Sequence, residues 1–110
     1  MLNNKLELII VVLLLIIPKS NLKSEQSFEY YLSQFYAKQS EATKILKEIE
    51  SDLKNGSRNN TCSRQKEAAS LGLKAIEMLI KAYEISEELT PLETIESNKL
   101  IWENLLGECL

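Results

Sequence analysis

The chain has 110 residues, with 13 Lys or Arg against 16 Asp or Glu, a formal net charge of -3 and a sequence pI near 5.1. This acidic balance disfavours nucleic-acid binding. The chain contains no histidine, which is the commonest general base and the usual ligand of transition metals. It also has no Gly-rich phosphate loop, c-type haem motif or HExxH motif. We therefore expect no catalytic residue, no metal site and no cofactor, and we interpret the chain as a non-enzymatic protein.

An uninterrupted apolar run from Leu8 to Ile17 lies near the N-terminus. As a helix this run spans about 15 Å, half of a hydrocarbon core that is about 30 Å thick. Its length suits the apolar core of a secretory signal peptide. We predict a signal peptide over residues 1–20, with cleavage between residues 20 and 24, and hence a secreted or periplasmic protein.

The flanks of this run leave an alternative open. Only Lys5 and the amino terminus are positive ahead of it, Glu7 offsets one of these charges, and no Ala-x-Ala-like cleavage site follows. An uncleaved anchor, with Lys19 and Lys23 on its downstream side, would make the protein membrane-anchored. A buried core helix is favoured least, because the run is apolar on every face and shows no helical period.

Residues 24–110 predict a single all-α domain. Three amphipathic stretches follow one another, separated by the polar linker Asn55 to Thr61 and by a capping sequence that begins at Thr90. Antiparallel neighbours with short connections form an up-down-up bundle. The predicted small three-helix bundle has helices at about 27–54, 63–89 and 91–108.

The first predicted helix has a narrow apolar seam. Its members recur in alternating steps of four and three, a pattern typical of a coiled coil, and Gln39 is the only polar one. We expect Ser24 or Ser27 to cap the start of this helix and Asn55-Gly56 to end it through a left-handed residue. The seam consists of Phe28, Leu32, Phe35, Gln39, Ala42, Leu46, Ile49 and Leu53. We expect the core to include the rings of Tyr31 and Tyr36 and to leave out Tyr30.

The second predicted helix has two apolar rows, which suits a helix that contacts two neighbours. Its small residues permit close helix approach, although Gly72 weakens the helix by about 1 kcal/mol relative to Ala. The first row is Ala68, Leu71, Ala75, Met78, Ala82, Ile85 and Leu89, and the second is Ile76, Leu79 and Tyr83.

The sequence Thr90-Pro91-Leu92-Glu93 predicts the start of the third helix. In this prediction Thr90 is the N-cap, Pro91 occupies the first turn and Glu93 completes a capping box. The buried side of the helix is expected to contain Leu92, Ile95, Trp102, Leu106 and Cys109.

Two cysteines, Cys62 and Cys109, lie in the part of the chain that we expect to be exported, where an oxidising compartment permits a disulfide. The bundle brings them to one pole but not level, because Cys62 lies nine residues further from Thr90 than Cys109 does, about 13 Å of helix. A disulfide needs Cα atoms about 4.4 to 6.8 Å apart. We predict an intramolecular disulfide, with Thr61 to Glu67 bending back to reach it. Fraying of the third helix, pairing between chains and two free thiols are the alternatives.

Charge is distributed unevenly along the chain. Four positive residues and no negative one lie between Lys54 and Lys66, whereas the stretch from Glu84 to Glu108 holds seven Glu against only Lys99. The positive residues are Lys54, Arg58, Arg64 and Lys66. They predict either a contact with an anionic partner or a pole that Glu103, Glu108 and the terminal carboxylate neutralise internally.

Together these patterns indicate an exported, non-enzymatic protein-interaction module of the inhibitor, immunity or assembly-factor type. Its partner would be a protein of unknown identity, with no nucleic acid involved. The alternative is a membrane-tethered structural protein that homo-oligomerises through the first helix. Membrane contact is expected only if the leader is retained, and both a monomer and a homo-oligomer remain open.

Overall fold

A computed structural model describes residues 6–10, 13, 26–86 and 91–109. Three long helices make up most of this part of the chain, and no strand occurs in it. They are α2 (Gln26–Lys54), α3 (Thr61–Ser86) and α4 (Leu92–Gly107). The prediction of an all-α helical bundle is confirmed.

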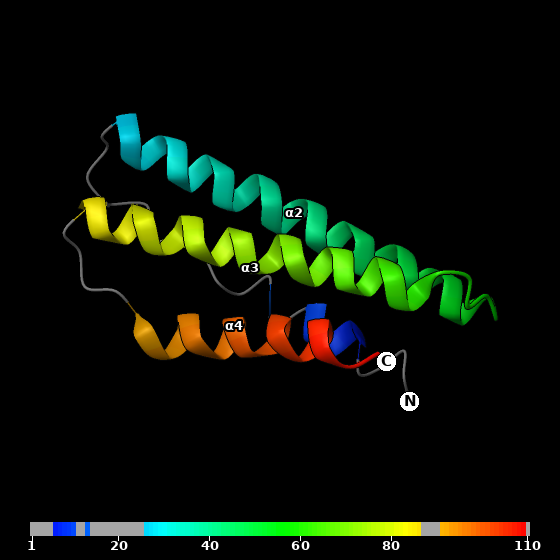
Figure 1. The fold of residues 1–110 in the computed structure, drawn as a ribbon. Helices are drawn as coiled ribbons and strands as arrows, with labels where there is room; N and C mark the ends of the chain where they lie inside the picture. The colour runs from blue at the N-terminus through cyan, green and yellow to red at the C-terminus, as the bar shows by residue number, and fades with distance from the viewer. Residues whose placement is uncertain (1–5, 11–12, 14–25, 87–90, 110) are drawn as a thin grey trace.

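Helix α3 is the centre of the bundle (Figure 1). Both α2 and α4 pack along it, but no Cα atom of α2 lies within 8 Å of one in α4. Each outer helix therefore depends on α3 for its helix–helix packing. This arrangement explains why the sequence of the central helix has two apolar rows.

The end of α2 is set by Asn55-Gly56, as predicted. Gly56 has a φ of 80°, in the left-handed region that a residue without a β-carbon adopts at little cost. The amide of Ser57 donates to the carbonyl of Asp52 at 2.8 Å, and the amide of Gly56 donates to that of Leu53 at 3.1 Å. These two bonds are those of a Schellman motif, which satisfies the last carbonyls of a helix.

The α2 seam is inside the bundle. Six of its members are buried, Gln39 among them, and Leu32 and Leu53 are partly buried. From α3 the second predicted row is buried together with the small residues Ala68, Ala69, Gly72, Ala75 and Ala82. Tyr31 is partly buried and Tyr30 is exposed, as expected, but the prediction that Tyr36 belongs to the core is wrong, because its side chain is exposed.

The break before α4 is confirmed, but its cap is not the predicted one. Pro91 occupies the N-cap position with φ −76° and ψ 76°, and no side chain donates or accepts a capping bond there. The amide of Ile95 donates to the carbonyl of Pro91 at 3.0 Å, and the helix begins at Leu92, one residue later than predicted. The N-cap assigned to Thr90 and the predicted end of the second helix at residues 87–89 lie outside the described residues.

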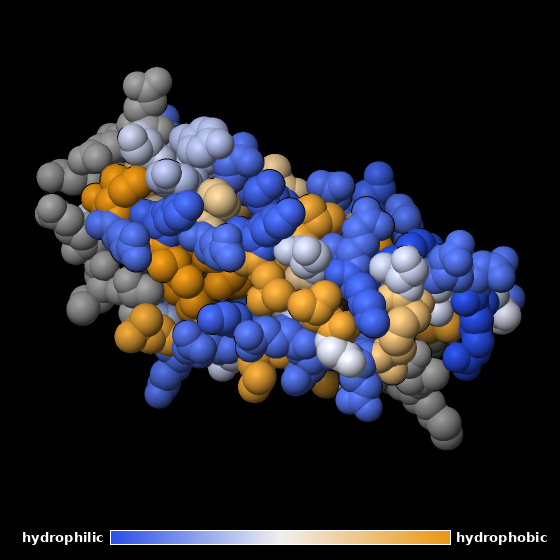
Figure 2. Space-filling view, viewed as in Figure 1, coloured by the Kyte–Doolittle hydropathy of each residue, from blue (hydrophilic) through white to orange (hydrophobic). Residues whose placement is uncertain are grey.

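The buried face of α4 is also rotated from the predicted one. It consists of Ile95, Asn98, Trp102 and Leu105. Leu92 is 66% exposed and Leu106 is 40% exposed, so their assignment to the core is wrong. Figure 2 shows apolar side chains gathered where α3 meets α4, bordered by hydrophilic ones. No helix in the described part of the chain is long and apolar enough to cross a membrane.

Candidate functional site

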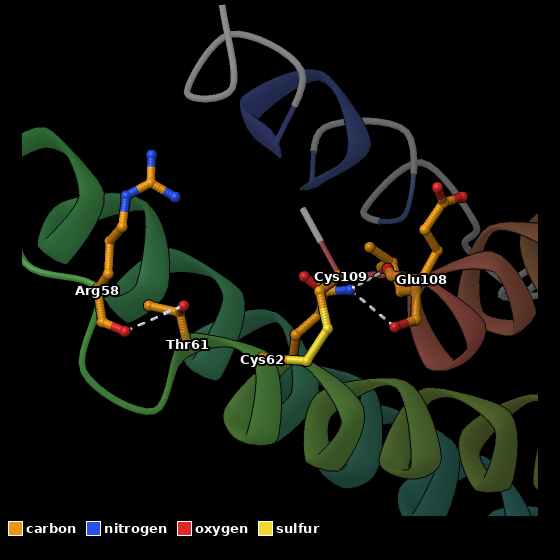
Figure 3. The surroundings of a disulfide bond; sticks show 7 residues. Arg58, Thr61, Cys62, Glu108 and Cys109 are labelled. Carbon is orange, nitrogen blue, oxygen red and sulfur yellow. Dashed lines mark hydrogen bonds between the residues drawn. A yellow bond between two sulfur atoms is a disulfide. The ribbon is translucent and has the colours of Figure 1, made fainter.

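Cys62 and Cys109 form a disulfide, and their Cα atoms are 5.3 Å apart (Figure 3). Cys62 belongs to the first turn of α3, and Cys109 follows the C-terminal end of α4. The bond therefore joins the start of the central helix to the end of the last one. The predicted intramolecular pairing is confirmed, and neither cysteine is free.

The bend predicted for Thr61 to Glu67 is wrong, because α3 is helical from Thr61 onward. The nine-residue offset between the two cysteines is instead compensated at the end of α4, where Glu108 is extended with φ −141° and ψ 128°. Contact between Gly72 and Trp102 fixes the register of the two helices. From Gly72 back to Cys62 is about 15 Å of helix, and from Trp102 to Cys109 is about 14 Å, because the chain leaves the helix after Gly107 and Glu108 is extended.

Gln65 holds the same end of α4 in place. Its side-chain amide donates to the carbonyl of Leu105 at 2.8 Å and to that of Glu108 at 2.7 Å. Helix carbonyls at a C-terminus have no partner within the helix, so Gln65 acts as a cap supplied by a neighbouring helix. Sequence analysis missed this role. The available signal was a glutamine three residues before Ala68, on the face of α3 that carries the small buried residues.

Two of the four basic residues pair with acids of α2. Arg64 lies 2.6 Å from a carboxylate oxygen of Asp52, and Lys54 lies 3.7 Å from one of Glu50. Both acids belong to α2, and neither is one of the acidic residues that the sequence suggested for this role. The terminal carboxylate lies outside the described residues. Arg58 and Lys66 are exposed, and Figure 3 shows the Arg58 side chain extending away from the disulfide.

The described part of the N-terminal apolar run packs into the bundle. Residues 6–10 are helical, and Leu6, Ile10 and Leu13 belong to the core that also contains Phe35, Leu46 and Trp102. Figures 1 and 3 both draw residues 6–10 near the C-terminal end of α4. This buried arrangement is the one that the sequence favoured least. We call residues 6–10 and 13 the N-terminal segment, and the bundle surface around Gln39 of α2 that covers it the seat.

Gln39 makes the polar contact between the seat and the segment. This side chain is buried, and its amide nitrogen donates to the carbonyl of Leu13 at 2.9 Å. Its amide oxygen has no hydrogen-bond partner. The single polar member of the α2 seam thus contacts the backbone of another segment, 26 residues away in the sequence.

No group of three or more His, Cys, Asp or Glu side chains that could hold a metal ion occurs among the described residues. No protein-family model matches the chain, and comparison with curated proteins and with solved structures finds no significant match. What the arrangement offers chemically is an apolar seat with one amide donor, beside a pole closed by a disulfide.

Proposed function

We propose that the chain is an exported, non-enzymatic protein-interaction module of the inhibitor, immunity or assembly-factor type. The observation that supports an extracytoplasmic location is the Cys62–Cys109 pair, whose Cα atoms are 5.3 Å apart. Disulfides persist in oxidising compartments, which agrees with a leader over residues 1–20 that is removed during export.

The small size of the domain supports a structural purpose for the disulfide. Once the leader is removed, about 86 to 90 residues remain, and a core of that size gives modest stability. A covalent bond between the start of α3 and the end of α4 restrains α4, which packs on α3 and not on α2. The chain then presents helix faces to a partner, with a chemistry suited to binding and not to catalysis.

The alternative, homo-oligomerisation through the first helix, receives no support from the α2 seam. Six of its eight members are buried within the chain itself. A seam that packs against α3 is not available to a second copy unless the bundle opens. The apolar seam of α2 therefore packs against the rest of the same chain.

Intact-mass spectrometry of the natively expressed protein tests the proposal. We expect a chain that begins between residues 21 and 25 in the extracytoplasmic fraction, with a mass about 2 Da below that of the reduced form. The Cys109→Ser variant is the matched control, since it should show the same leader removal without the mass difference. A cytosolic protein that retains residues 1–20 would contradict the proposal.

A further inference from the structure

The N-terminal segment occupies a place that the three long helices do not fill themselves. Helices α2 and α4 both pack on α3 without approaching one another. Leu13 of the segment contacts α2 through Gln39, and residues 6–10 lie near the C-terminal end of α4. Removal of the leader uncovers this seat, so the processed bundle has an apolar surface that the unprocessed chain covers.

The segment presents one face to the seat. Leu6, Ile10 and Leu13 follow steps of four and three, and they are the buried residues of the segment. Between them, Glu7 is exposed and Leu8 is 63% exposed. The seat therefore accommodates one side of a short helix and leaves its other side to solvent.

The seat contacts the segment through a hydrogen bond to its main chain as well as through apolar side chains. Its Gln39 amide donates to a peptide carbonyl, and the Gln39 oxygen is buried without a partner. When the segment is absent, the Gln39 nitrogen loses its carbonyl partner, and a bound helix would restore that bond. No Asp, Glu, Lys or Arg belongs to the buried residues of the described chain, so the inserted face must be uncharged.

We infer that the seat, once uncovered, binds a short aliphatic helix of a protein partner outside the cytoplasm, in the place that residues 6–10 and 13 occupy before processing. Leu6, Ile10 and Leu13 define the recognition pattern, and Gln39 recognises a main-chain carbonyl of the bound helix. Helix-in-groove recognition of this kind uses apolar anchors at the same spacing. The inference rests on the proposed function, because it requires that the leader is removed.

The processed protein and synthetic peptides provide the direct test. A peptide of residues 1–13 with a solubilising lysine tail is titrated against the processed protein and followed by NMR of the Gln39 side-chain amide. We expect saturable one-to-one binding that shifts this resonance. Two peptide variants form a matched pair. Ile10→Asp should weaken binding at least about tenfold, and Leu8→Asp should change it by less than about twofold.

A variant of the seat tests the polar contact. Gln39→Met keeps the length and apolar character of the side chain but removes the donor, so affinity for the wild-type peptide should fall about fivefold to tenfold. Equal binding of the Ile10→Asp and Leu8→Asp peptides would overturn the inference. So would a processed protein that forms a dimer insensitive to the peptide, or one that binds lipid vesicles and not the peptide.

A second measurement uses the full-length chain and does not require the processed bundle to be stable. Thermal unfolding of the Ile10→Asp and Leu8→Asp chains should show a lowered Tm for the first and an unchanged Tm for the second. Equal Tm values would show that the segment is not held by the seat, which rejects the inference and leaves the export proposal intact. Intact mass showing a retained leader would reject the proposed function itself.

Discussion

The indole ring of Trp102 lies against the backbone of Gly72, so closely that a β-carbon at position 72 would overlap the ring carbons Cδ2 and Cε2. Both residues are buried. The contact sets the distance between α3 and α4 and the rotation of α4 about its axis. It also sets the register that brings Cys109 level with Cys62.

Replacing Gly72 with Ala should destabilise the protein, although Ala favours a helix interior by about 1 kcal/mol. The added β-carbon forces the indole away from α3, and overpacking of this kind costs about 1 to 3 kcal/mol. The free energy of unfolding in urea measures the effect. Gly107→Ala is the matched control, since nothing lies within 4 Å of a β-carbon at that helical position, and it should leave stability unchanged or slightly raised. A Gly72→Ala variant as stable as the Gly107→Ala variant would show that the two helices are not in this contact.

Gln65 caps the C-terminal end of α4, so its replacement should loosen that end. The Gln65→Leu substitution removes the donor to Leu105 and Glu108 but keeps an apolar side chain of similar length. We expect a loss of about 1 to 3 kcal/mol, because a buried carbonyl loses its partner. Hydrogen exchange should also quicken at the amide of Glu108, which donates to Asn104 at 3.0 Å. Gln34→Leu on α2, at a partly buried glutamine, is the control and should alter neither quantity. Unchanged exchange at Glu108 in the Gln65 variant would argue against the cap.

The disulfide should contribute a large part of the stability of the domain. It closes a loop of 47 residues, for which the chain-entropy estimate is about 4 kcal/mol. We expect Cys109→Ser to lower the free energy of unfolding by a few kcal/mol, up to that estimate. Cys62→Ser and the double variant should show the same loss, since either substitution removes the whole bond. Thiol titration of the unfolded, unreduced wild-type chain should detect no reactive thiol, and two thiols per chain would reject the bond.

Local sequence predicts the helices of this protein well. The seam of α2 and its termination at Gly56 depend on residues close together in the chain, and the structure agrees with both. The two rows of α3 predicted two neighbours, because the number of apolar faces reflects the number of contacts. The pairing of Cys62 with Cys109 was predicted from compartment and topology, without the geometry that closes it.

Relationships between helices were harder to predict. One helical residue corresponds to a rotation of about 100°, so a predicted buried face of α4 that included Leu106 left out its neighbour Leu105. The polar residue Asn98 is also buried, and the apolar pattern alone did not predict it. The cap that Gln65 supplies depends on the α3–α4 register, which no periodicity within one helix contains. Burial of the N-terminal segment was missed for a related reason, because the run is apolar on every face and its buried side is chosen by the seat.

Arg64 of α3 and Asp52 of α2 form the shorter of the two ion pairs found in the described residues. Nη2 of Arg64 lies 2.6 Å from Oδ2 of Asp52 and also donates to the carbonyl of Asn59 at 3.2 Å. The side chains are 26% and 40% exposed, so solvent screens the pair, and Arg64→Ala should cost no more than about 1 kcal/mol. The loss should shrink in about 1 M salt, where the Debye length is about 3 Å.

Lys66→Ala is the control, because this neighbouring cation is exposed and its removal should change stability by less than about 0.5 kcal/mol. A double-mutant cycle with Asp52→Ala isolates the coupling between the two side chains. Equal effects of the Arg64 and Lys66 substitutions at low salt, with no coupling in the cycle, would show that the pair does not join α2 to the start of α3 in solution.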